Sequence, residues 1–373
     1  MANTHRIHVL GIPHTQTNPV FTGCAFTQKV LKFLDMMAPR GHHIYHYGHE
    51  LSQTPDQPNV EHVTVITDRE HRQAYGDEYV DQQRWRDLGF AHYYDIQDTA
   101  HSHFHATAIK EIERRKQPGD LLLCFWGWGV KPISDAHPDL IAIEPGIGYG
   151  GAWARWRVYE SHAIRNAMVG IDGVNQCTQD WYHVVIPNYF NPDDFAYNTV
   201  KDDYVLYLGR IGWNKGVDIA IDATQAAGKR LIIAGQGSLK DLGYTTTPQH
   251  VTCVGYANQD LRKYLMSRAQ SLFIASRYLE PFGGVQVEAW LSGTPVISPD
   301  WGAFAEFNRD GVTGYRCRTR RDFVDALHNT RQLNARQCRE HAQQFTYQHI
   351  APQYERYFDD VQNVYTSQGW NTI

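Results

Sequence analysis

The sequence predicts an α/β protein with two domains, each built on a parallel sheet. The chain has 373 residues, which is long for one domain. Short apolar runs typical of buried strands alternate with longer segments of helical periodicity. This alternation occurs in two series, and residues 186–203 between them are rich in Pro, Asn and Asp. We therefore expect two Rossmann-like domains whose sheets face each other across a cleft.

The first series contains seven expected strands, each a short run of apolar residues. A helix is expected over Phe26–Met37, and the last segment of the chain has a helical pattern that suits a return to the first domain. We assign residues 1–187 and 348–373 to this domain. The expected strands are Ile7–Ile12, His43–Tyr47, His62–Ile66, Leu121–Phe125, Leu140–Ile143, Ala167–Gly170 and His183–Ile186.

The second series, residues 188–347, contains five expected strands with helical patterns between them. One helix is expected over Ala257–Ser267. Another is expected over Val285–Leu291, where a Gly pair precedes the helix and Gly293-Thr294-Pro295 ends it. The expected strands are Tyr204–Leu208, Leu231–Ala234, Val251–Val254, Leu272–Ala275 and Pro295–Ser298.

The composition narrows the class of protein. The net charge of -5 and the pI near 6.5 give no general affinity for phosphate backbones. Six cysteines lie far apart without a C-x-x-C pair, so neither a zinc ribbon nor a redox pair is indicated. The N-terminus lacks an apolar signal region, and no apolar run is long enough to cross a bilayer. We therefore expect a cytoplasmic protein.

Two glutamates, Glu280 and Glu288, lie on either side of the Gly283-Gly284 pair that begins the helix at Val285. A helix N-terminus presents free N–H groups and partial positive charge, which suit a phosphate. Glycines let the backbone approach such a group closely. Carboxylates would repel the phosphate, so we expect them to accept hydrogen bonds from hydroxyls on other parts of the ligand.

Other segments that end expected strands of the second domain add to this constellation. Arg210 and Lys215 follow the first of these strands and would complete an anion site, and Gly235 ends the next strand. In open α/β sheets, ligands bind beyond the carboxyl ends of the strands. Cations for a diphosphate and acceptors for hydroxyls on both sides of it indicate a nucleotide sugar.

Three motifs in order resemble the retaining GT-B-fold glycosyltransferases of family 4, also called glycosyl transferases group 1. They are "EPFGGVQVEAWLSGTPVI", similar to the E-x7-E signature; "GRIGWNKG", similar to the Arg and Lys motif; and "VIPNYFNPDDF", similar to the interdomain segment. In the last motif Tyr189 stands where the family commonly has Gly. The resemblance implies a metal-independent hexosyltransferase-like enzyme without a cofactor. It would move a sugar from a nucleotide-diphosphate sugar, with a UDP-sugar favoured, to an acceptor hydroxyl while keeping the anomeric configuration.

The same resemblance implies roles for individual residues. Arg210, Lys215 and Glu280 would be catalytic: the two cations neutralise the leaving diphosphate, and Glu280 contacts the transferred sugar. Glu288 would hold the ribose hydroxyls. The remaining donor-binding residues would be Gly23, Gly235, Val254, Tyr256, Gly283, Gly284 and Val285.

The acceptor is expected to be a glycan or another hydroxyl compound bound by the first domain. Candidate acceptor-side residues are His14, Glu144, Tyr159, Glu160 and His162. The loop "EPGIGYGGAWARW" carries a G-x-G-x-x-G pattern, so a nicotinamide-dependent oxidoreductase is an alternative. The pattern follows about the fifth strand, however, and we interpret the loop as an acceptor-side element whose helix begins near Trp153 and Trp156.

Two further alternatives keep the fold but change the reaction or the acceptor. A sugar phosphorylase or epimerase could use the same site. The aromatic and basic run Trp153–Tyr159 could stack on nucleic acid, so hydroxymethylated bases of phage-type DNA are an alternative acceptor. The chain has no D-x-D motif, and the cluster "HSHFH" at His101–His105 suits a solvated helix start better than a metal site. We therefore expect no metal.

Overall fold

The computed structural model describes residues 3–21, 23–77, 95–173 and 180–367. Contacts within the chain divide it into two compact units, which we describe separately. Unit 1 comprises Met1–Glu160, Arg165–Tyr189 and Tyr347–Ile373, and unit 2 comprises Ser161–Ile164 and Phe190–Thr346. The chain thus forms most of unit 2 between Phe190 and Thr346 and returns to unit 1 at Tyr347.

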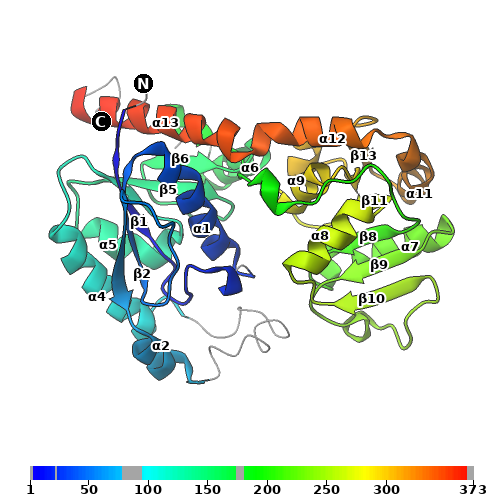
Figure 1. Ribbon diagram of the computed structural model, residues 1–373, viewed down its shortest axis with the longest axis horizontal. Coiled ribbons are helices and arrows are strands. Elements are labelled where there is room, and N and C mark those ends of the chain that lie inside the picture. The colour runs from blue at the N-terminus through cyan, green and yellow to red at the C-terminus, as the bar shows by residue number, and fades with distance from the viewer. Residues whose placement is uncertain (1–2, 22, 78–94, 174–179, 368–373) are drawn as a thin grey trace. The chain divides into compact units, whose positions relative to one another are not determined.

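In the described part of unit 1, seven parallel strands form one sheet in the order β3-β2-β1-β4-β5-β6-β7 (Figure 1). The first strand pairs with β2 on one side and β4 on the other, with Ile7 opposite both Ile44 and Leu121. The strands are β1 (Arg6–Leu10), β2 (His43–His49), β3 (Val60–Ile66), β4 (Leu121–Leu123), β5 (Ile141–Ile147), β6 (Trp156–Tyr159) and β7 (Val184–Val185).

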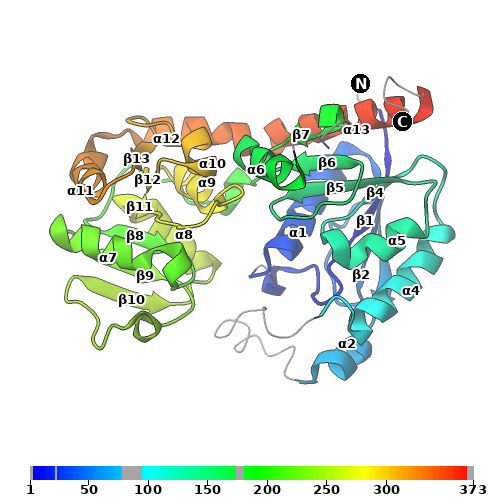
Figure 2. The same cartoon turned by 180° about the vertical axis from the view of Figure 1, so that it is seen from behind.

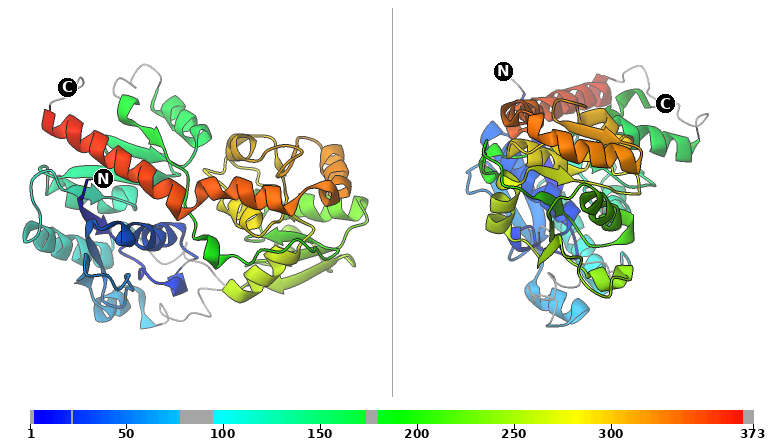
Figure 3. Two further views of the ribbon diagram at one scale, coloured as in Figure 1. Left: turned by 45° about the horizontal axis from the view of Figure 1, so that its top comes forward. Right: turned by 90° about the vertical axis from the view of Figure 1, so that its right-hand side faces the viewer.

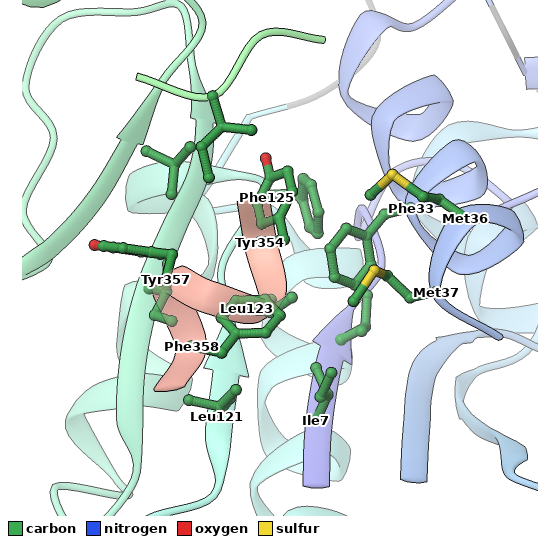
Figure 4. Packing of buried hydrophobic residues seen from close by; sticks show 14 of the residues in the cluster. Ile7, Phe33, Met36, Met37, Leu121, Leu123, Phe125, Tyr354, Tyr357 and Phe358 are labelled. Carbon is green, nitrogen blue, oxygen red and sulfur yellow. The ribbon is translucent and has the colours of Figure 1, made fainter. Parts of the chain in front are cut away.

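Helices cover both faces of this sheet, as its mostly buried strands require. The face with α1 and α13 holds one hydrophobic cluster, and the face with α4 and α5 holds another (Figure 2). Figure 4 shows Tyr354, Tyr357 and Phe358 of α13 packed against side chains of α1, β1 and β4. The helices are α1 (Ala25–Met37), α2 (Asp68–Tyr75), α4 (Thr99–Glu113), α5 (Lys131–Asp135), α6 (His162–Asp172) and α13 (Tyr347–Ser367).

The long helix α13 ends the described chain and lies beside α1 (Figure 3). Arg40 and His42 of unit 1 both contact Glu355 of this helix: Arg40 Nη2 lies 2.6 Å from Oε2, and His42 Nε2 lies 3.1 Å from Oε1. Apolar burial and these polar contacts together fix the C-terminal helix on the N-terminal sheet.

In unit 2, six parallel strands form a second sheet in the order β10-β9-β8-β11-β12-β13. Helices α8 and α9 pack on one face, and α7 and α11 pack on the other. The strands are β8 (Val205–Leu208), β9 (Leu231–Ala234), β10 (Val251–Gly255), β11 (Ser271–Phe273), β12 (Val296–Pro299) and β13 (Gly314–Cys317); the helices are α7 (Val217–Ala226), α8 (Gln259–Arg268), α9 (Gly284–Leu291), α10 (Gly302–Phe307), α11 (Arg320–Asn329) and α12 (Ala335–Ala342).

The two parallel-sheet α/β domains predicted from the sequence are confirmed, with three local corrections. The expected strand Ala167–Gly170 is wrong, because these residues lie inside α6, whose apolar residues recur at helical spacing. The helix expected near Trp156 is instead strand β6, which alternates large residues and buries Trp156 and Val158. Strand β13 was not predicted, because its four residues, Gly314–Cys317, include a glycine and an arginine and form no apolar run.

Short helical turns connect several of these elements. The turns next to the site are η8 (Trp213–Lys215) after β8 and η9 (Leu239–Leu242) after β9; the others are η1 (Pro19–Phe21), η2 (Ala38–Arg40), η4 (Gly127–Val130), η6 (Asp180–Tyr182), η7 (Pro192–Asp194), η10 (Thr330–Gln332) and η11 (Gln343–Phe345). Within the described ranges, no helix combines the length and the apolar character that a membrane span requires.

Candidate active site

The loops that follow β8, β9 and β11 lie against one another at the carboxyl edge of the unit 2 sheet. A Cβ atom on Gly235 would lie 1.8 Å from the carbonyl oxygen of Gly209, and one on Gly216 would lie 2.0 Å from that of Ala275. The Arg277 N–H donates to the carbonyl of Asn214 at 2.9 Å. Glycine is therefore required at two points where backbone meets backbone, and the loops carrying the predicted residues are held together.

Glu280 is surrounded by three donors from these loops. Its Oε1 accepts hydrogen bonds from Lys215 Nζ at 2.5 Å, from Tyr278 OH at 2.7 Å and from Ser276 Oγ at 2.8 Å. The Lys215 ammonium also lies 4.7 Å from the centre of the Tyr278 ring. Two predicted catalytic residues are thus in direct contact, as an ion pair.

Glu288 projects from α9 and is 8% exposed. Its Oε2 lies 2.5 Å from Nη2 of Arg262, a residue of α8. The Glu288 carboxylate is the main cause of the raised pKa of Arg262. An arginine that the sequence did not single out therefore orients the predicted ribose-binding carboxylate.

Gly283 and Gly284 form the start of α9. Gly283 precedes the helix with a φ of 73°, a left-handed conformation that favours glycine, and a Cβ there would lie 2.5 Å from Cε1 of Phe304. No side chain caps the helix at this residue. The first N–H groups of a helix have no partner within the helix, so the backbone of Gly284 and Val285 offers donors to an anion.

The other predicted residues of unit 2 lie at the same strand ends. Arg210 is exposed just after β8. Burial raises the pKa of Tyr207 and of Tyr278, and the positive charge of Arg210 acts in the opposite direction on both. Arg210 therefore lies near Tyr278, which contacts Glu280. Val254 and Tyr256, at the end of the edge strand β10, are 37% and 44% exposed. The predicted unit 2 residues thus lie at the end of β10, in the loops after β8, β9, β10 and β11 or on α9, while their roles toward a ligand stay predictions.

In unit 1, Glu144 is fully buried and holds the Gly-rich loop. Its Oε2 accepts from the backbone N–H groups of Trp153 and Ala154, each at 2.7 Å, and its Oε1 accepts from Tyr149 OH at 2.9 Å. Burial is the main cause of its raised pKa, and these hydrogen bonds act in the opposite direction. The contacts give Glu144 a structural role in positioning the loop between β5 and β6.

Three further candidates lie at the end of β6: Tyr159 is its last residue, Glu160 follows it, and His162 begins α6. Glu160 is buried and forms an ion pair with Lys29 of α1, whose ammonium also donates to the Gly146 carbonyl at 2.7 Å. Tyr159 is 1% exposed. The His162 side chain is exposed, and its backbone N–H donates to Glu306 at 3.1 Å. Their contacts with an acceptor stay predictions.

Gly23 and His14 lie on the segment between β1 and α1. Gly23 is exposed directly before Cys24, the first residue flanking the helix. His14 is 1% exposed, with its ring 4.8 Å from that of Trp126 and 5.9 Å from that of His101, and burial lowers its pKa well below the usual value. Its ring is therefore neutral and lies within the protein.

The histidine cluster at the start of α4 is helical, as predicted, but it is not solvated throughout. His101 is fully buried and bonded through Nδ1 to the helix cap Asp98 at 2.9 Å, whereas His103 is exposed. The correction follows from helix geometry, because residues two apart on a helix face different directions.

The sequence missed three residues that contact the two glutamates: Ser276, Tyr278 and Arg262. The first two lie within four residues of Glu280, so their proximity was a usable signal. Arg262 stands among the many polar residues of α8, and nothing in its local pattern distinguishes it from a solvated arginine.

Comparison with known proteins gives a family match within unit 2. Residues 202–332 match the family described as Glycosyl transferases group 1. An uncharacterized glycosyltransferase of Methanocaldococcus jannaschii is 34% identical over 154 residues, 35% of this chain and 39% of that protein. A glycogen synthase of Mycobacterium tuberculosis is 33% identical over 126 residues, 31% of this chain and 30% of that protein. The chain thus matches between three and four tenths of the length of these relatives.

Solved structures resemble both units. Sucrose-phosphate synthase from Thermosynechococcus elongatus matches with a TM-score of 0.67 and 14% identity, over 96% of this chain and 99% of that one. Anabaena HepE in complex with UDP and glucose matches with a TM-score of 0.61 and 16% identity, over 95% of this chain and all of that one. None of these similarities favours an oxidoreductase or a DNA-modifying enzyme. The chain has the GT-B fold, and its residues 202–332 match the glycosyl transferases group 1 family.

Proposed function

We propose that the protein transfers a sugar from a nucleotide-diphosphate sugar to an acceptor hydroxyl. One observation carries the proposal: Lys215 forms an ion pair with Glu280 shortly before the uncapped start of α9, Glu288 projects from that helix, and Arg210 lies in the loop after β8. The group 1 match over the same residues supports it.

In the proposed reaction, the N–H groups that begin α9 bind the diphosphate, and Lys215 and Arg210 stabilise the negative charge that grows as it leaves. Lys215 then divides its hydrogen bonds between the phosphate and Glu280. Glu280 accepts hydrogen bonds from the transferred sugar, and Glu288, oriented by Arg262, accepts them from the ribose. We propose that the sugar keeps its anomeric configuration, as the E-x7-E resemblance implies.

The donor would be a UDP-sugar, and the acceptor a glycan or another hydroxyl compound. Because the site's cations and helix start supply positive charge, we propose that no metal or other cofactor is required. Hydrolysis of UDP-glucose, UDP-N-acetylglucosamine and GDP-mannose by the whole chain, followed by transfer to a panel of saccharides, tests the proposal. We expect release of the nucleoside diphosphate from at least one donor, with activity that survives EDTA.

The anomeric proton coupling of the product, measured by NMR, should match that of the donor. An inverted product would remove the protein from the retaining class, and activity lost in EDTA and restored by magnesium or manganese would contradict metal independence. Failure to hydrolyse or transfer from any nucleotide sugar would refute the proposed function.

A further inference from the structure

A cavity of about 320 Å³ opens at the carboxyl ends of β11, β12 and β13 in unit 2. Ile219 of α7 and Phe323 of α11 form its apolar wall. These helices cover one face of the sheet, whereas Glu288 and Arg262 belong to α9 and α8 on the other face. The volume is at the small end of the range for ligand pockets, ~300–1,000 Å³. The cavity therefore lies away from the Glu288–Arg262 pair, although Ser276, which contacts Glu280, is part of its lining.

The polar groups of the cavity come in ion pairs. The Arg277 guanidinium donates to both oxygens of Asp218, at 2.8 and 2.6 Å. Asp300 accepts from Arg318 Nε at 2.8 Å, and Arg316 Nε lies 3.4 Å from its other oxygen. Both guanidinium groups that line the cavity thus already have a carboxylate partner. Such a lining disfavours a phosphate, which needs cations whose charge is not already balanced.

The same ion pairs keep hydrogen-bonding capacity for a neutral ligand. A guanidinium has five N–H donors in one plane, and a carboxylate has about four acceptor sites. A hydroxyl group both donates and accepts. A ring with neighbouring hydroxyls would donate to Asp300 and accept from Arg318 without bringing any charge into the cavity.

An exposed indole completes the lining. Trp301, between β12 and α10, lines the cavity and is 42% exposed. Leaving so large an apolar face in water forgoes burial free energy of ~25 cal/mol per Å². The axial C–H groups of a pyranose form an apolar face that covers such an indole, while its hydroxyls point toward the ring edge. The indole of Trp301 and the ion-paired groups of Asp300 and Arg318 together fit a sugar ring.

We propose that this cavity binds one pyranose ring of a neutral saccharide. The loop after β11 joins it to the candidate active site, because Ser276, which donates to Glu280, lines the cavity together with its neighbour Arg277. A glycan held here would stay at a high effective concentration beside the sheet edge that carries Glu280 and Glu288. This consequence for catalysis rests on the proposed function; the binding itself requires no donor.

The test uses the whole chain without a nucleotide sugar. A glycan array with neutral and acidic saccharides identifies ligands, and calorimetry measures affinity for the best free neutral oligosaccharide. Trp301→Ala and Arg318→Gln should each weaken binding at least tenfold. Arg318 is 75% exposed, so its variant should fold even if Trp301→Ala does not. Trp181→Ala removes an indole of unit 1 that is 73% exposed, and it should bind like the wild type.

Three results would overturn the proposal. The first is that no neutral saccharide binds. The second is that the wild type and both cavity variants bind the saccharide with equal affinity. The third is that millimolar inorganic phosphate displaces the saccharide from the wild type but not from Arg318→Gln. Hydrolysis of the nucleotide sugar without saccharide should be unchanged in Arg318→Gln. Loss of saccharide binding with normal hydrolysis therefore separates this proposal from the proposed transfer reaction.

Discussion

Each glutamate of the candidate site is held by a cation from a distant part of unit 2. Lys215 is 65 residues from Glu280, and Arg262 is 26 residues from Glu288. A partly buried carboxylate without a partner would be costly, because its charge would lose hydration without compensation. The pairs therefore orient the glutamates, and a ligand that binds them must share or replace these contacts.

Replacing Glu288 with glutamine should weaken binding of UDP. The substitution removes a charged acceptor for the ribose hydroxyls and leaves Arg262 without its partner, a loss on the order of 1.5–3 kcal/mol. Calorimetry with UDP measures the change. Glu340→Gln, on the exposed surface of α12, serves as the matched control. Equal affinity in Glu288→Gln and wild type would contradict the ribose assignment.

Replacing Lys215 with methionine should reduce turnover far more than it reduces stability. The side chain keeps its length, but the positive charge for the leaving diphosphate is lost, and a single electrostatic donor in such sites contributes ~10²–10³-fold to turnover. Turnover with the donor that the wild type accepts, compared with the thermal unfolding midpoint, gives both quantities. Lys240→Met in the exposed η9 turn is the control, and near-normal turnover in Lys215→Met would exclude the anion-site role.

At the scale of the element, the start of α9 depends on a backbone that only glycine supplies easily. Gly283 has a φ of 73°, and a Cβ atom there would lie 2.5 Å from Cε1 of Phe304, so this turn has no room for a side chain. The buried side chains of α9, among them Trp290, hold the rest of the helix in the core. The apolar residues of α9 thus fix the position of the helix, and Gly283 leaves its N-terminus without a side-chain cap.

The substitution Gly283→Ala should lower both stability and UDP affinity. The positive φ and the 2.5 Å approach to Phe304 together should cost about 1–3 kcal/mol. Gly243→Ala is a matched control, because Gly243 has a φ of 86° with open space around the added methyl group. Urea unfolding measures the difference. If both variants lose the same stability, the contact with Phe304 contributes nothing.

At the scale of the whole molecule, unit 1 encloses several histidines whose pKa values burial lowers. Burial is the main cause that lowers the pKa of His46 and His49 to about 3 and that of His71 to about 4. Neighbouring imidazoles add to the effect, since the His49 and His71 rings lie 4.4 Å apart. The fold therefore depends on these side chains staying uncharged.

The protein should lose stability as the pH falls from 7 to 5. In this window the unfolded chain protonates its histidines, whose usual pKa is about 6.5, while the folded state keeps the three neutral. The unfolded state then binds more protons, and each histidine lowers the free energy of unfolding by on the order of 2 kcal/mol between pH 7 and 5. Stability should level off above pH ~7.5.

Thermal unfolding followed by circular dichroism at pH 7 and pH 5 measures this loss. Asparagine at His49 should reduce the pH dependence, because one proton-binding site of the unfolded chain is removed. His328→Gln, on the exposed face of α11, should leave it unchanged. An unfolding midpoint that does not move between pH 7 and 5 would refute the prediction.

The sequence by itself determined the two parallel-sheet domains, and it predicted a candidate site at one edge of the unit 2 sheet. Alternating apolar and amphipathic segments, and glycines beside Glu280 and Glu288, are local patterns that can be read along the chain. Two short segments were predicted wrongly: a helix was expected where β6 lies, and a strand was expected within α6. A few apolar residues suit either periodicity.

Only the tertiary structure decided which side chains meet. The contact of Arg262 with Glu288, the use of Glu144 as an anchor for the Gly-rich loop, and the burial of His14 all depend on residues brought together from separate elements. Such contacts leave no local pattern, since an arginine or a histidine has the same neighbours in sequence whether it faces water or the core. The physical reason is that burial and pairing are properties of packing, whereas periodicity is a property of the chain.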